Sequence, residues 1–161
     1  MGQIGFDIAL GREVELWNRV DGNDPTNSVI VIMVLAHSGL VSDSTLKAYA
    51  SFSAILAGAS NEVTNTNYAR KVLTDANVSP VTVDNTFHTV TITLADQTFT
   101  SIAAGESWSK WVMGYDPDST GGTDADIVPF AAGDLRIDGS PVVPNGNNII
   151  MSWPDGVAVG R

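Results

Sequence analysis

The segment Val29–Ala36 has the sequence Val-Ile-Val-Ile-Met-Val-Leu-Ala, eight apolar residues in a row without a charge. Five of the eight are β-branched, which favours an extended backbone over a helix. The turn-forming residues Asp24–Asn27 precede the segment, and Ser38 and Gly39 follow it. Because every position is apolar, and not every second one, we expect both faces of the strand to be covered. The segment therefore predicts the buried central strand of the domain.

The composition favours a single β-rich globular domain. The chain has 161 residues, a usual length for one domain. Apolar residues make up 43% and charged residues 16%, so a core can form while many polar residues remain for turns. The absence of cysteine excludes disulfides and thiolate metal sites.

The charge and the apolar pattern exclude two classes of partner. A formal net charge of −10 argues against nucleic acid, because Lys and Arg supply most of the affinity for phosphate. We expect no membrane segment, because a spanning helix needs about twenty apolar residues. Residues 1–6 also lack the pattern of a signal peptide. The acidity either confers solubility alone or steers the protein toward basic surfaces.

The order of patterns predicts a β-rich α+β fold with sandwich-like antiparallel sheets and one main helix. The helix is expected over about residues 42–57, where apolar residues recur at helical spacing and Gly58 follows as a C-cap. Residues 1–11 are weakly patterned and are interpreted as an extended N-terminal arm that orders against a partner. Residues 12–153 would form the domain, and 154–161 a C-terminal tail.

Period-two patterns predict the remaining strands. Arg12–Val20 alternates like a half-exposed strand, although its Glu and Leu residues also allow a short helix. Residues 87–94 alternate most clearly, and 97–102 could pair with them. Further strands are expected at 68–73, 81–83, 109–115, 127–130 (a short edge segment), 134–137 and 148–153.

The acidic segment Asp116–Asp126 is the strongest candidate for a metal site. Its carboxylates at Asp116, Asp118, Asp124 and Asp126, with a Gly at the sixth position, are similar to a calcium loop. Ile127 stands where that loop has a bidentate Glu, and no helix is predicted on either side. A solvated turn between two strands is therefore favoured, and no metal or other cofactor is predicted.

Catalysis is not predicted, because the two histidines, His37 and His88, occur without a recognisable partner pattern. Protein contacts are better supported. The adjacent Arg70 and Lys71 suit either a salt bridge on a strand face or a contact with an acidic neighbour. Trp108 and Trp111 are either core residues or interface anchors. The predicted interface residues are Ile4, Phe6, Arg12, Arg70, Lys71, Trp108 and Trp111.

Several phrases together resemble a family of small structural proteins encoded by tailed bacteriophages. The resemblance extends over about residues 11–137, and its phrases are 11–15, 18–20, 23–28, 68–71, 73–76, 95–99 and 115–129. It implies a virion component without catalytic residues. The first expectation is a capsid decoration (cement) protein on the exterior of the capsid. Its partner there would be the major capsid protein, and it would itself be a homo-oligomer, a trimer or a dimer. The alternatives are a neck, tail or fibre-attachment protein, and a carbohydrate-binding module for host recognition.

Overall fold

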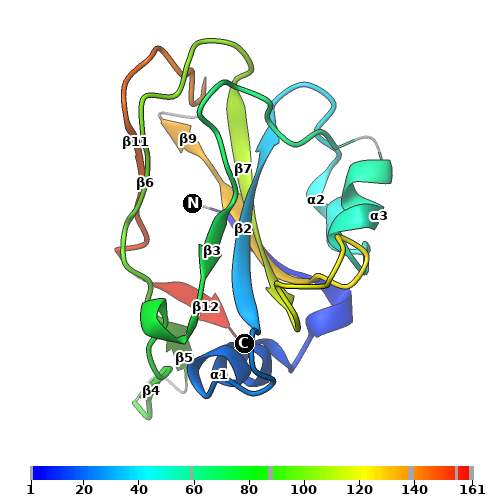
Figure 1. Cartoon of the computed structure of the whole chain (residues 1–161), viewed down its shortest axis with the longest axis vertical. Coiled ribbons are helices and arrows are strands. Elements are labelled where there is room, and N and C mark those ends of the chain that lie inside the picture. The colour runs from blue at the N-terminus through cyan, green and yellow to red at the C-terminus, as the bar shows by residue number, and fades with distance from the viewer. Residues whose placement is uncertain (1, 59, 87–88, 138–139, 155, 160–161) are drawn as a thin grey trace.

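The computed structural model describes residues 2–58, 60–86, 89–137, 140–154 and 156–159. Its main element is a five-stranded antiparallel sheet with the strand order β1-β8-β7-β2-β3 (Figure 1). The strands are β1 (Gln3–Gly5), β2 (Val29–Ala36), β3 (Lys71–Leu73), β7 (Trp108–Asp116) and β8 (Val128–Asp134). β2 lies inside this sheet between β7 and β3, and all of its residues are buried. The prediction of a buried strand at Val29–Ala36 is confirmed, while the middle position belongs to β7.

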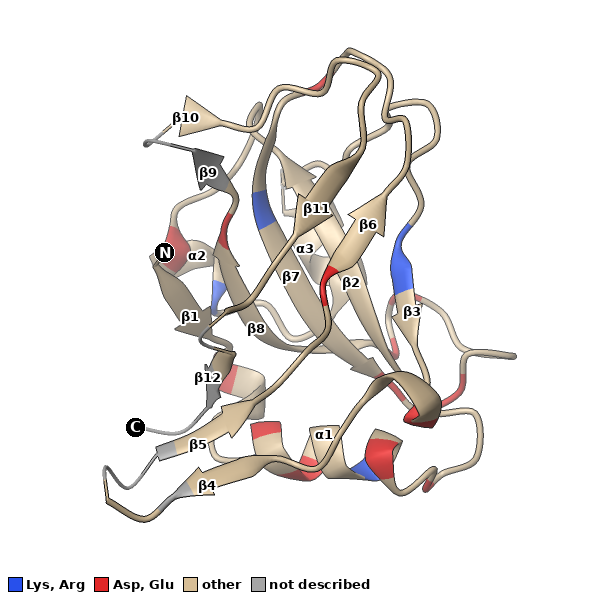
Figure 2. Cartoon of the chain, turned by 90° about the vertical axis from the view of Figure 1, so that its left-hand side faces the viewer, with Lys and Arg blue, Asp and Glu red and all other residues tan. Residues whose placement is uncertain are grey.

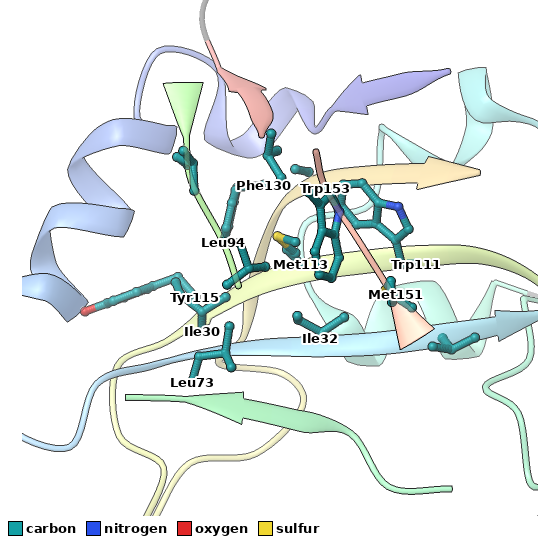
Figure 3. Packing of buried hydrophobic residues seen from close by; sticks show 14 of the residues in the cluster. Ile30, Ile32, Leu73, Leu94, Trp111, Met113, Tyr115, Phe130, Met151 and Trp153 are labelled. Atoms are coloured by element: carbon teal, nitrogen blue, oxygen red, sulfur yellow. The ribbon is translucent and has the colours of Figure 1, made fainter. Parts of the chain in front are cut away.

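Alternate residues of β2 belong to two separate hydrophobic clusters, one on each face of the sheet. Ile30 and Ile32 point into the larger cluster (Figure 3). Val31 and Met33 point into the smaller one. This separation follows from the period-two geometry of a strand, which sends neighbouring side chains to opposite faces. Coverage on both faces is why no position of the segment is polar.

Three further small antiparallel sheets are present, β10–β9, β11–β6 and β12–β5–β4, and the last two supply buried side chains to the larger cluster. Their strands are β4 (Thr82–Asp84), β5 (Thr89–Ile92), β6 (Gln97–Phe99), β9 (Arg136–Ile137), β10 (Ser140–Pro141), β11 (Ile149–Met151) and β12 (Val157–Val159). Phe99 of β6 and Met151 of β11 share the larger cluster with Ile32 of β2. The predicted β-rich α+β fold is thereby confirmed.

The opposite face is covered by two short helices, α2 (Asp43–Leu46) and α3 (Phe52–Ala57) (Figure 1). The prediction of one continuous helix over 42–57 was wrong, although its place on one face of the sheet was right. The first helix ends at its C-cap Lys47, and Ser51 begins a new one because it is extended and its hydroxyl caps α3 by accepting from the Ala54 amide. Phe52 packs against Gly114 of β7, where an added Cβ would lie only 2.5 Å from the ring.

Residues 13–21 form the helix α1 (Glu13–Asp21), so the predicted strand over Arg12–Val20 was wrong and its helical alternative was right. Leu16, Trp17 and Val20 are buried on one side of the helix, at the spacing of a helical face. Glu15 on the exposed side pairs with Arg12 and Arg19, which supports the helix further.

The N-terminal residues are part of the domain, which corrects the prediction of a free arm over 1–11. Residues Gln3–Gly5 pair with β8 as β1, and a single turn of 3-10 helix, η1 (Asp7–Ala9), follows. Phe6 is fully buried in the smaller cluster. At the other end of the chain, β12 pairs with β5, so part of the predicted tail 154–161 is also in a sheet.

Smaller differences concern pairing and strand length. β6 pairs with β11 and not with the predicted strand over 87–94, of which the structure describes β5. The expected edge segment 127–130 belongs to β8, which lies between β1 and β7. Of the predicted strand over 68–73, only Lys71–Leu73 forms a strand of the sheet.

Candidate functional site

The strongest polar constellation is centred on Arg70, directly before β3. Its guanidinium donates to Glu62 through Nε (2.8 Å to Oε1) and Nη2 (2.7 Å to Oε2). Nη2 also donates to Asp124 Oδ2 at 2.8 Å. The ring of Phe52 lies 5.6 Å from the guanidinium carbon. Arg70 therefore holds two carboxylates from distant parts of the chain in one half-buried cluster.

The same cluster is tied to the sheet through Tyr68. Its hydroxyl donates to Glu62 Oε1 at 2.8 Å and accepts from the backbone amide of Val34 in β2, at 3.0 Å. Burial, and then the charge of Glu62, raise the pKa of Tyr68, so the phenol stays protonated. Hydrogen bonds to Asp124 and Glu62 raise the pKa of Arg70. Two roles were predicted for Arg70, a salt bridge within the chain and a contact with an acidic neighbour, and the structure shows the salt bridge.

The four carboxylates of the acidic loop 116–126 do not come together at one site. Asp116 accepts from the Asp118 amide, Asp118 accepts from the amide and hydroxyl of Thr120, and Asp126 accepts from those of Thr123. These hydrogen bonds lower the pKa values of Asp118 and Asp126.

Asp124, the fourth candidate, is engaged by Arg70. Within the described residues no group of three or more potential metal ligands comes together. The loop thus consists of turns that its own carboxylates support at Asp116, Asp118 and Asp126, with Asp124 tied to Arg70, as expected for a turn between two strands.

Trp108 and Trp111 lie in the core, so the structure does not form the contact patch predicted for them. Both are buried, and the Trp108 Nε1–H donates to Asn65 Oδ1 at 2.9 Å. Lys110 between them is also buried, and its Nζ atom lies 2.7 Å from Asp134 Oδ1 and 3.0 Å from Asp43 Oδ1. This lysine links β7 to β8 and to α2.

The predicted N-terminal interface residues are only partly accessible. Phe6 is buried and Ile4 is half-buried against the smaller cluster. Arg12 is exposed and paired with Glu15. The accessible apolar side chains of this region are Ile8 and Leu10, 44% and 63% exposed, which the sequence reasoning missed. The signal available was their alternation with the small residue Ala9, which is buried.

Lys71 lines a surface pocket of about 470 Å³ between β3 and β6. Its Nζ donates to the Thr98 carbonyl at 2.7 Å and lies 4.7 Å from the centre of the Phe99 ring. It makes no ion pair with a carboxylate of the described residues. The structure therefore shows no strand-face salt bridge for Lys71 among the described residues, and its contact with an acidic neighbour stays a prediction.

The histidines give no catalytic arrangement in the described part of the chain. His37 Nδ1 lies 2.9 Å from Ser109 Oγ, but Ser109 is fully buried, so its hydroxyl cannot meet a substrate. His88 lies outside the described residues.

Asp and Glu residues are spread over several elements, α1 among them, and Lys and Arg residues are few (Figure 2). No helix among the described residues has the length and apolar character to cross a bilayer.

Comparisons of the chain with protein-family models, with curated proteins and with solved structures find no match.

Proposed function

We propose that the protein is a structural component of a tailed-phage virion and that it binds the outside of the major capsid shell as a decoration protein. The observation that carries this proposal is the placement of the phrases that resemble the phage family. Arg70 from residues 68–71 binds Asp124 from residues 115–129. The Ser119 amide from that same phrase donates to the Asn27 carbonyl from residues 23–28. The segments that carry the resemblance thus bind one another and hold the fold together. This is compatible with a protein that acts through its surface and not through a catalytic site.

The N-terminal surface is the proposed attachment site. Ile8 and Leu10 are two large exposed apolar residues separated only by Ala9, and they lie on η1 and directly after it. Their backbone is held in place, because the Asp7 amide donates to the Lys47 carbonyl and the Arg12 amide to the Ala9 carbonyl. A preformed apolar contact loses little conformational entropy on binding. Many copies on one shell would add modest contacts through multivalency.

Copy number tests this function. The protein should be measured by quantitative mass spectrometry in purified particles of the phage whose genome encodes it, relative to the major shell subunit. A decoration protein is expected in a fixed and high ratio to that subunit. A few copies per particle would favour the neck, tail or fibre-attachment alternative, and absence from washed particles would contradict a virion role.

A further inference from the structure

The pocket between β3 and β6 is an open surface groove whose two walls are joined by two hydrogen bonds. At one end Asn67 Nδ2 donates to the Ser101 carbonyl at 2.9 Å. At the other end Lys71 Nζ donates to the Thr98 carbonyl at 2.7 Å. Ala69, Phe99 and Thr100 complete the lining. The volume is about 470 Å³, and the pocket is open to solvent along its outer side.

The lysine of this pocket is positioned and still able to donate. The Phe99 ring and the Thr98 carbonyl hold its ammonium from two sides. The Phe99 ring is itself held by its neighbours. It stacks on Tyr68 with 6.0 Å between the ring centroids, and it meets Trp108 edge-on with 5.1 Å between the centroids. An ammonium has three donors, of which the carbonyl takes one, so two remain for a ligand.

The charge around the lysine favours a single negative charge on the ligand. None of the described residues that line the pocket is acidic, although the chain has 18 Asp and Glu residues. One ammonium balances one carboxylate, whereas the net charge of −10 would repel a polyanion. A phosphate carries nearly two charges at neutral pH and is less well matched.

The remaining polar groups favour a ligand with hydroxyls. The Asn67 amide and the Thr100 and Ser101 hydroxyls offer donors and acceptors along one side of the pocket. Asn67 (φ +72°) and Ser101 (φ +51°) both have left-handed backbones, which is uncommon for serine. Strained backbone that persists at the rim of a pocket is typical of binding sites.

We propose that this pocket is a binding site for an acidic sugar, with the sugar carboxylate on Lys71 and its hydroxyls on Asn67, Thr100 and Ser101. The site is separate from the proposed attachment surface at Ile8 and Leu10, and it goes beyond the decoration function. The pocket lies beside β3, whereas η1 follows β1, and these two strands are the opposite edges of the main sheet.

Nuclear magnetic resonance on the isotope-labelled full chain tests the proposal. Sodium glucuronate is titrated first, and glucose and sodium acetate follow as the uncharged sugar and the bare carboxylate. The amide shifts are expected at residues 67–71 and 98–101, with glucose and acetate each weaker than glucuronate by about tenfold. No shift with glucuronate, shifts elsewhere, or acetate binding as tightly as glucuronate would overturn the proposal.

Lys71→Met is expected to weaken glucuronate binding by about tenfold, since it removes a charge-assisted hydrogen bond. Lys47→Met is the matched control, because Lys47 also makes no ion pair with the described residues but lies directly after α2 as its C-cap, and it should bind like the parent. Equal binding by the Lys71 variant would contradict the site. Should that variant not fold, the map of shifts on the parent chain decides alone.

Discussion

The guanidinium of Arg70 donates from Nη2 to Asp124 Oδ2 at 2.8 Å, across 54 residues of sequence. The bond joins the segment before β3 to the acidic loop between β7 and β8. The same loop gives its Asp124 and Ile127 carbonyls to the first amides of α3. Arg70 thus fixes the loop that completes the N-terminus of α3, and removing it should affect more than one element.

Arg70→Met is expected to lower the free energy of unfolding by about 2 kcal/mol, because Glu62 and Asp124 would remain partly buried without their cation. Chemical denaturation measures this change. Arg12→Met is the matched control, since its pair with Glu15 is on the surface and contributes at most about 0.5 kcal/mol. Equal effects of the two substitutions would show that the Arg70 cluster is not a stabilising unit.

Acid should weaken the same contact. The hydrogen bond from Arg70 holds the pKa of Asp124 below its ordinary value of 3.8. Because the folded pKa is the lower one, the contribution is present above 3.8 and is lost as the pH falls through the folded value. Between about pH 4 and pH 2, the parent should therefore lose more stability than Asp124→Asn. Parallel stability curves for the two proteins would contradict this assignment.

Ile32→Asp is expected to unfold the domain, because Ile32 is fully buried in β2 and an unpaired charge there costs more than about 4 kcal/mol. The signal is loss of the cooperative thermal transition. Val72→Asp, on β3 and with a side chain 52% exposed, should remain folded. Retention of the parent's melting curve by the Ile32 variant would exclude β2 from the core.

The strand β2 could be predicted from the sequence because the residues that determine it are adjacent in the chain. An uninterrupted apolar run between turn residues has one good solution, a strand covered on both faces, and both clusters confirm it. The helix α1 was less clear because Val14, Leu16 and Asn18 alternate over a stretch too short to separate the two periods. The adjacent buried pair Leu16 and Trp17 was the better signal, since a half-exposed strand would not bury both.

The candidate site was harder to predict because it depends on pairings between distant segments. Nothing near Arg70 in the sequence indicates Asp124, and Glu62 becomes its neighbour only when residues 62–63 return beside β2. The pocket beside Lys71 likewise needs β6 to lie next to β3. The N-terminal arm was misjudged because Phe6 has no local pattern, and its burial depends on the pairing of β1 with β8 and on the distant residues of the smaller cluster.

Deletion of residues 1–11 is expected to destabilise the domain by more than about 3 kcal/mol, because it removes β1 and the fully buried Phe6. Differential scanning calorimetry provides the test. A truncated protein that melts at the parent's temperature would restore the interpretation of these residues as an independent arm.

Leu10→Ser is expected to leave the melting temperature almost unchanged and to weaken attachment to the particle, because its side chain is 63% exposed on the proposed contact surface. Co-sedimentation with particles stripped of the protein measures attachment. Val83→Ser, on β4 and 58% exposed, is the control and should sediment like the parent. If both variants bind alike, the contact surface lies elsewhere.

Cryo-electron microscopy of the intact particle is the most direct measurement of the proposed function. We predict density for this β-rich domain repeated over the outer face of the shell, with Ile8 and Leu10 turned toward the major capsid protein. A map in which the domain is confined to the neck or tail, or in which the shell surface is bare, would contradict the proposal.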